Sequence, residues 1–243
     1  MGTRPVTDAL LHGGVPDGAP DEGATAGGGG PEVRLIETPE GPGRVRIHRP
    51  TPATGAQPPR GTVVLGHGAG GQGDSADLAR LATVLPGDGW VVALLDQPWR
   101  VAGKKVASRP ERLDEAFIPM ARSLFHGERP LPRPFVSAGR SAGARVACRT
   151  AEAVCADAVV ALSFPLHPPG RPDRSRYAEL AGAVRLGLPL LVVQGERDPF
   201  GGPEELRAAG LDGSLLTPVR GTHSPNPGDV AAAVRDFLAA LAP

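Results

Sequence analysis

Apolar residues after position 60 fall into short continuous runs, separated by stretches in which they recur at helical spacing. Continuous apolar runs of this length are typical of parallel strands covered on both faces. Strands that alternate with helices predict an α/β fold with a mostly parallel, twisted sheet flanked by helices. The predicted strands are 61–65, 90–95, 135–138, 158–163, 188–194 and 214–219, and the clearest helices are 75–85, 109–126 and 230–241.

The residues before this alternation follow two other patterns. Val33–Glu37 and Arg44–Arg49 alternate with period two around a Pro/Gly turn, which predicts an N-terminal antiparallel hairpin with one solvated face. Residues 1–30 contain three prolines, a Gly27–Gly30 tract and little apolar periodicity. Such a composition cannot offset the entropy cost of ordering, so we predict a disordered tail over 1–30 and one domain over 31–243.

The pentapeptide Gly139-Arg140-Ser141-Ala142-Gly143 lies between a predicted strand and an alanine-rich helical pattern. Gly-x-Ser-x-Gly is a weak signal in a chain with 34 glycines, and the strand-turn-helix context gives it its weight. In that context the pattern predicts a nucleophile elbow, with the Ser141 hydroxyl projecting from the rim of the sheet. Side chains at positions 139 and 143 would collide with neighbouring backbone. The amide of Ala142, at the start of the helix, would face an anion formed beside Ser141.

A glycine-rich loop, Gly66 to Gly71, directly follows the strand 61–65. Such a loop lets backbone amides approach a ligand closely, and phosphate is one candidate ligand. The Lys-Ser/Thr of a Walker A loop is missing, and the loop fits the dinucleotide-binding pattern poorly. We therefore interpret the loop as the second half of an oxyanion hole, in which the amide of Ala69, or that of Gly70, opposes the amide of Ala142.

Two further residues follow later predicted strands. Asp198 lies in Gly195–Gly201 and His223 lies in Gly221–Ser224. The carboxyl ends of parallel strands meet at one rim, so Ser141, Asp198 and His223 are expected to lie close together. Serine needs a base, and the imidazole needs a carboxylate that holds its tautomer. The chain order Ser, Asp, His is that of the α/β hydrolases.

Composition limits the other classes of function. The 243 residues include 26 basic and 26 acidic side chains, so no global field would attract nucleic acid or an anionic membrane. No apolar stretch has the length of a membrane span, and no basic segment precedes an apolar one at the N-terminus, so a cytoplasmic protein is expected. Cys148 and Cys155, seven residues apart, are expected on one helix face as buried, reduced thiols. Neither has metal-ligand spacing with a histidine.

Two further segments are interpreted from their place in the chain. The basic concentration of Arg100, Lys104, Lys105, Arg109 and Arg112 is interpreted as a solvated face in preference to a site for an anionic substrate. Residues 164–185 follow the strand 158–163 and are expected to wall the site as an inserted segment. Within it, His167 is interpreted as an ordinary loop residue in preference to a residue that contacts substrate.

From Val33 onward the chain resembles the α/β-hydrolase superfamily, through the segments GHGAGG, GRSAG, GERDPFG and GTHS. Within it, the chain is most similar to the α/β-hydrolase-like domain family of testis-expressed protein thirty and the scaffold subunit of the NSL histone acetyltransferase complex, and to dienelactone hydrolases. The resemblance implies Ser141 as nucleophile, Asp198 as acid and His223 as base, with Ala69 and Ala142 supplying the oxyanion amides. Dienelactone hydrolases carry cysteine in place of Ser141, so their substrate is not implied.

The sequence therefore predicts a serine hydrolase that cleaves small carboxylic esters or thioesters through an acyl-enzyme, without a metal or an organic cofactor. Its expected partner is a small-molecule ester, with no nucleic acid and no membrane, and the oligomeric state is left open. The alternative is an interaction module that keeps the fold but has no catalytic activity.

Overall fold

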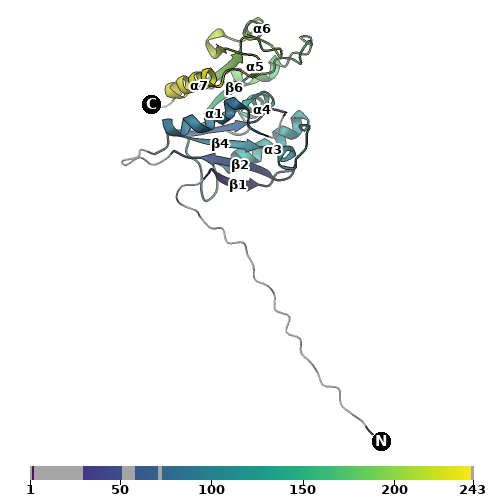
Figure 1. The fold of residues 1–243 in the computed structure, drawn as a ribbon, viewed down its shortest axis with the longest axis vertical. Helices are drawn as coiled ribbons and strands as arrows, with labels where there is room; N and C mark the ends of the chain where they lie inside the picture. Colours follow the sequence, from purple (N-terminus) through teal and green to yellow (C-terminus); the bar gives the residue numbers. More distant parts are fainter. Residues whose placement is uncertain (1, 3–29, 51–57, 71–72, 242–243) are drawn as a thin grey trace. The chain divides into compact units, whose positions relative to one another are not determined.

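An eight-stranded sheet forms the centre of the structure, a computed structural model that describes residues 2, 30–50, 58–70 and 73–241 (Figure 1). The predicted tail over 1–30 lies outside the described residues, apart from Gly2 and Gly30. The strands follow the order β1-β2-β4-β3-β5-β6-β7-β8 across the sheet. They are β1 Glu32–Ile36, β2 Gly43–His48, β3 Gly61–Gly66, β4 Trp90–Asp96, β5 Phe135–Arg140, β6 Ala158–Leu162, β7 Leu190–Gly195 and β8 Leu216–Val219.

Strand direction follows the two hydrophobic patterns. β1 and β2 pair antiparallel, β2 pairs antiparallel with β4, and all remaining pairs are parallel. The hairpin strands alternate in burial, whereas β3, β4, β6 and β7 are buried along their whole length. The predicted antiparallel hairpin with one solvated face and the predicted buried parallel strands are both confirmed. The parallel strands β3 to β8 consequently end at one rim of the sheet.

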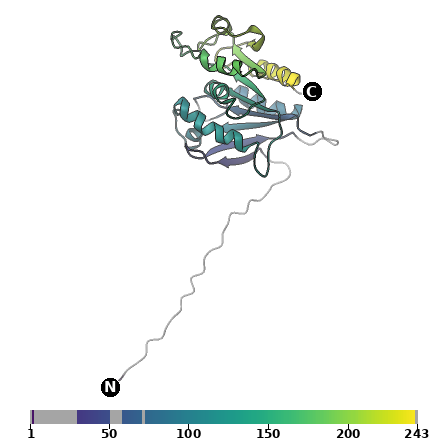
Figure 2. The same ribbon diagram turned by 180° about the vertical axis from the view of Figure 1, so that it is seen from behind.

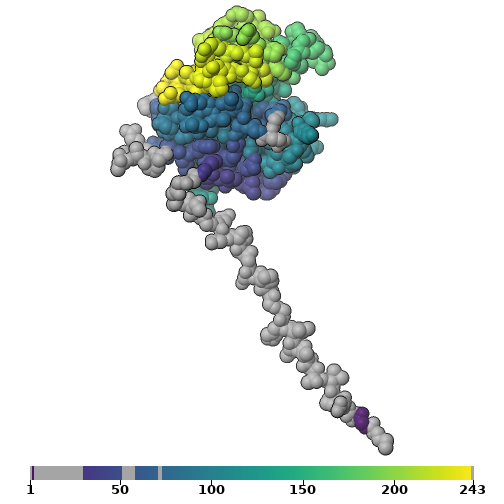
Figure 3. Space-filling model, in the orientation of Figure 1, coloured from purple at the N-terminus to yellow at the C-terminus, as the bar shows by residue number. Residues whose placement is uncertain are grey.

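Helices cover both faces of the sheet. On one face α1 (Ala76–Val84) and α7 (Pro227–Leu241) lie side by side, and they form a continuous surface in the space-filling view (Figure 3). The opposite face, seen from behind in Figure 2, carries α2 (Pro98–Val101), α3 (Pro110–Ser123), α4 (Ala142–Thr150) and α5 (Tyr177–Arg185). A short helix, α6 (Pro203–Ala208), and two 3₁₀ turns, Leu85–Asp88 and Gly213–Leu215, complete the fold. Each face thus buries its own apolar cluster against the sheet.

Three helices and one cysteine differ from the prediction. The short helices α2 and α6 were not predicted, and α5 lies inside the segment expected to be an inserted wall. Cys148 is buried, and burial raises the pKa of its thiol to about 12. The placement of Cys155 on the same helix face is wrong, because α4 ends at Thr150 and Cys155 is exposed with φ 53°. The chain must turn here to enter β6, and Arg133 Nη2 holds the turn by donating to the Cys155 carbonyl at 2.6 Å.

Across the described ranges, every helix is too short or too polar to span a lipid bilayer.

Candidate active site

The turn between β5 and α4 holds Ser141 in an unusual backbone conformation, with φ 56° and ψ −113°. The turn is tight because the backbone of α4 passes directly over β3 and β5. A Cβ atom on Gly139 would lie 2.4 Å from the Gly143 carbonyl oxygen, and one on Gly143 would lie 2.3 Å from the Gly66 carbonyl oxygen. Real Cβ atoms essentially never come within 3.0 Å of a neighbour. The predicted need for glycine at both positions is therefore confirmed.

The structure brings Ser141, His223 and Asp198 into one hydrogen-bonded chain. His223, on the loop after β8, lies with Nε2 2.9 Å from Ser141 Oγ and with Nδ1 2.8 Å from Asp198 Oδ2. The Asp198 carboxylate can accept a hydrogen bond but cannot donate one. The proton of the neutral imidazole is therefore on Nδ1, and the unprotonated Nε2 accepts a hydrogen bond from the serine hydroxyl. Each residue follows the carboxyl end of a parallel strand, as the prediction required.

The Asp198 side chain is completely buried, and its carboxylate is held by donors from its own loop and strand. Oδ1 accepts the Phe200 amide at 2.9 Å, and Oδ2 accepts both the His223 ring and Gln194 Nε2, the latter at 3.0 Å. Gln194 is itself fully buried at the end of β7. Its role was not predicted from the sequence, although a polar residue that ends a buried apolar strand is a signal that could have found it.

His223 is also held by contacts outside its ring nitrogens. The Phe200 ring lies tilted against the imidazole with centroids 4.2 Å apart. Arg140, the residue before the nucleophile, donates from Nη2 to the His223 carbonyl oxygen at 2.7 Å and to Ser224 Oγ at 3.2 Å. This guanidinium ties the elbow to the histidine loop, a role that the Gly-x-Ser-x-Gly pattern does not reveal because its second position is variable.

The loop after β3 places Ala69 and Gly68 next to the elbow. Ala69 and Ala142 line the same pocket, and a Cβ on Gly68 would lie 3.5 Å from Ser141 Cβ. His67 sets the direction of this loop. Its Nδ1 lies 2.7 Å from the Gly68 carbonyl oxygen, and its Nε2 accepts the Gln97 amide at 3.1 Å. The Gly68 carbonyl is therefore turned toward His67, and the Ala69 N–H on the same trans peptide points the opposite way.

His67 is buried and uncharged. Burial lowers the pKa of this imidazole to about 4, and nearby Arg100 disfavours its charge further, against the effect of the Gly68 carbonyl. The neutral ring donates with one nitrogen and accepts with the other, which matches the two neighbours that it has. His67 was missed as a structural anchor, because only the glycines of the loop suggested a function.

A second histidine, His167, fastens the segment after β6 to α6. Its Nδ1 lies 2.9 Å from the Pro168 carbonyl oxygen and its Nε2 lies 2.9 Å from Glu205 Oε2. Both neighbours are acceptors. Burial opposes charge on this ring, but the Pro168 carbonyl and the Glu205 carboxylate outweigh it and raise the pKa of His167.

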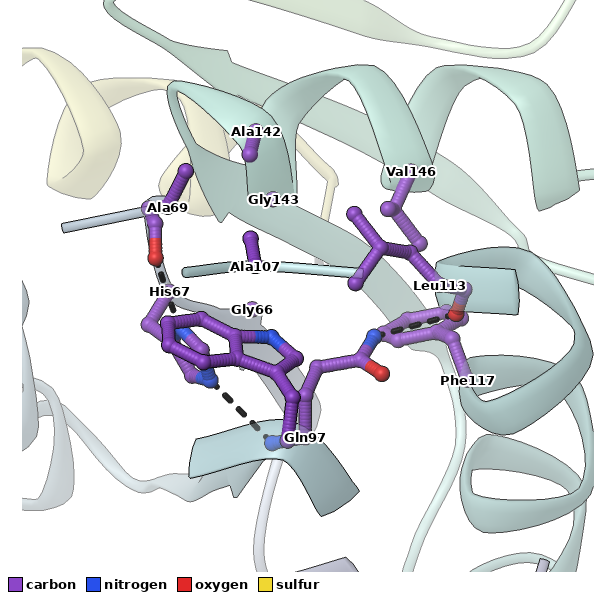
Figure 4. A pocket seen from close by; sticks show the side chains of 12 residues that line it. Gly66, His67, Ala69, Gln97, Ala107, Leu113, Phe117, Ala142, Gly143 and Val146 are labelled. Carbon is purple, nitrogen blue, oxygen red and sulfur yellow. Dashed lines mark hydrogen bonds between the residues drawn. The ribbon is translucent and has the colours of Figure 1, made fainter. Parts of the chain in front are cut away.

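A small pocket lies beside the elbow, with a cavity volume of about 10 Å³. The backbone of residues 66–69 and the first turn of α4 form one end of it, and Leu113, Phe117 and Val146 close the other (Figure 4). Gln97 lies between these ends and donates from Nε2 to the Leu113 carbonyl oxygen at 3.1 Å. Ala107 contributes from the loop before α3.

The prediction of a solvated basic face is wrong for one of its five residues. Arg100 is buried, and its guanidinium lies 3.2 Å from Asp96 and 3.9 Å from Asp74. Lys104, Lys105, Arg109 and Arg112 are exposed, and Arg112 pairs with Glu40 at 3.2 Å. None of the five lines the pocket.

Comparison with known proteins supports the fold. The chain is similar to the crystal structure of an α/β serine hydrolase without a lid from Xanthomonas campestris, at TM-score 0.68 and 19% identity over 88% of this chain and 96% of that one. It is also similar to an α/β serine hydrolase homologue from Coxiella burnetii, at TM-score 0.64 and 19% identity over 89% and 100%. The esterase domain of a Rhodothermus marinus protein matches at TM-score 0.60 and 18% identity over 86% and 96%.

The search of curated proteins gave no match. Residues 59–227 match the family model of the alpha/beta hydrolase domain, a range that extends from β3 through Ser141 and Asp198 to His223. The chain therefore belongs to the α/β hydrolase family.

Proposed function

We propose that this protein is a serine hydrolase that cleaves small carboxylic esters or thioesters through an acyl-enzyme. The observation that carries the proposal is the unbroken hydrogen-bonded chain from Asp198 through His223 to the Ser141 hydroxyl. Ser141 Oγ attacks the substrate carbonyl carbon while its proton passes to His223 Nε2, and Asp198 stabilises the imidazolium that forms. The amides of Ala69 and Ala142 donate to the oxyanion.

Collapse of the first tetrahedral intermediate breaks the bond to the leaving group, which takes the proton from His223 Nε2 as it departs. Water then repeats the attack on the acyl-enzyme, with His223 again as base, and releases the acid. These steps balance without a metal or an organic cofactor. The similar structures are those of serine hydrolases and of an esterase domain, which supports this reaction class.

Replacement of the nucleophile tests the proposal. Ser141→Ala should lower kcat/KM for p-nitrophenyl acetate by about 10⁴-fold or more, as in other triads. Ser137→Ala is a matched control, because Ser137 lies on β5 and its buried hydroxyl has no hydrogen-bond partner within the described ranges. A fluorophosphonate probe should label the wild type and Ser137→Ala but not Ser141→Ala. Unchanged turnover in Ser141→Ala would refute the assignment, and a wild type that neither turns over nor labels would favour the non-catalytic interaction module.

We also propose that the chain groups, within its superfamily, with the α/β-hydrolase-like domain family of testis-expressed protein thirty. The motifs GHGAGG, GRSAG, GERDPFG and GTHS support this grouping. Labelling at Ser141 would distinguish this chain from the scaffolds that occur among such relatives.

A further inference from the structure

The pocket beside the elbow begins at the two alanines whose amides would hold the oxyanion. Ala69 and Ala142 line it at one end, while Leu113 and Val146 stand across from them (Figure 4). A carbonyl oxygen seated between the two amides would therefore lie at the mouth of this pocket. One of the two other substituents of that carbonyl carbon must then enter the pocket or pass beside it.

Proton transfer decides which substituent enters. The leaving group receives its proton from His223 Nε2, so it must depart on the side of His223. His223 comes from the loop after β8, and Phe200 and Arg140 pack around it. Among the residues that the structure describes, the pocket is lined only by members of 66–146, and none of them comes from the His223 or Asp198 loop. The pocket therefore lies on the other side of the reacting carbon, where the acyl chain extends.

The lining sets what kind of acyl chain fits. The described part of the lining contains no Asp, Glu, Lys or Arg side chain, and its one titratable member, His67, is neutral with both ring nitrogens already hydrogen-bonded. A charged acyl group would lose its hydration there without gaining a partner, which is unfavourable. The cavity volume is only about 10 Å³, which is roughly the space of one water-sized group, so the slot has room for little more than a methyl group.

We propose that this pocket is the acyl-binding slot and that it restricts the enzyme to the shortest uncharged acyl groups, of which acetyl fits best. Leu113, Phe117 and Val146 set the length limit. The inference rests on the proposed serine hydrolase function and adds the substrate class to it.

A series of p-nitrophenyl esters tests the length limit on the full chain. The value of kcat/KM should be highest for acetate and should fall by about tenfold or more by butyrate, because each methylene that the slot cannot hold costs about tenfold or more. A mono-ester of succinate should be a poorer substrate than butyrate, because it places a carboxylate in the slot. A profile that stays flat or rises toward octanoate would overturn the inference.

Substitution at Val146 tests the position of the slot. Val146→Ala should raise the ratio of kcat/KM for butyrate over acetate by about tenfold, and Val146→Leu should lower the same ratio. Val234→Ala is the matched control, because Val234 is equally buried but lies on α7, in the apolar cluster across the sheet. If Val146→Ala does not fold, Val146→Leu alone still tests the position of the slot. Unchanged ratios in the folded variants would show that the acyl chain lies elsewhere.

Labelling separates the two ways to fail. If a fluorophosphonate labels Ser141 and esters are hydrolysed without a preference for short chains, the slot is wrong and the hydrolase stands. If Ser141 neither labels nor supports turnover of any ester, the proposed function is refuted, and the acyl assignment with it.

Discussion

Substitution of Gly143 by alanine would test how tightly the elbow is packed. The added Cβ would lie 2.3 Å from the Gly66 carbonyl oxygen and 2.9 Å from the His67 carbonyl oxygen, where ordinary contact begins at 3.4 Å. Both neighbours are backbone atoms at the end of β3, which cannot rotate away. The start of α4 and the end of β3 would therefore have to separate by about 1.1 Å.

This separation is expected to lower both the stability of the protein and its catalytic rate. Overpacking of this kind destabilises a protein by about 1–3 kcal/mol, and the preference of helices for alanine over glycine returns up to about 1 kcal/mol. We therefore expect Gly143→Ala to lose about 1–2 kcal/mol of unfolding free energy. The shift also moves the Ala142 amide relative to Ala69, and a misplacement of about 1 Å costs on the order of 10²-fold in rate.

Urea unfolding and the hydrolysis of p-nitrophenyl acetate would measure both effects. The matched control is Gly182→Ala in α5, where the nearest atom to the added Cβ is Arg185 Nη2 at 3.8 Å. This variant should gain about 0.5–1 kcal/mol and keep full activity. If Gly143→Ala behaves as Gly182→Ala does, the close contact between α4 and β3 does not hold the elbow in place.

His67 and His167 should make the free energy of unfolding depend on pH in opposite directions. The pKa of His67 is about 4 in the folded protein, against an ordinary value of 6.5. Its contribution to the free energy of unfolding is therefore fully present above pH 6.5, and roughly 3 kcal/mol of it is lost as the pH falls toward 4. Urea titrations should show this loss in the wild type and not in His67→Asn, and parallel curves would contradict it. His167 has a raised pKa, so its contribution is present below 6.5 and is lost as the pH rises through the folded value. His167→Gln should cost roughly 1 kcal/mol at about pH 5.5 and less at about pH 9, and an equal loss at both would count against the Glu205 contact.

The sheet and the order of the site residues could be predicted because their signals are local. A parallel strand buried on both faces needs a continuous apolar run, and each run is visible in the sequence. Parallel strands also share one rim, so residues just after Arg140, Gly195 and Val219 must approach one another wherever the intervening helices lie. The structure brings Ser141, Asp198 and His223 together for this reason.

The errors have a common cause in contacts made over long distances along the chain. Arg100 pairs with Asp96 only four residues earlier, but its burial also involves distant residues. β2 packs against α2, and Arg46 of β2 binds Asp74, which lies 3.9 Å from the Arg100 guanidinium. Cys155 leaves the helix because the chain has to return to the start of β6, although its neighbours would suit a helix. Likewise, α5 packs its Leu180 into the core, whereas proline and arginine dominate the sequence just before it.

In the proposed mechanism, different parts of the chain serve the two sides of the scissile bond. Residues 66–146 supply the nucleophile, the two candidate oxyanion amides and the whole lining of the slot. Residues 194–224 supply the base, the acid and the groups that hold them, and they face the departing group. Within the proposed mechanism, the choice of acyl chain and the release of the alcohol or thiol are therefore separable. Arg140 joins the two parts through the His223 carbonyl, so its loss should weaken catalysis for every acyl length alike, whereas changes at Val146 should alter only the preference among lengths.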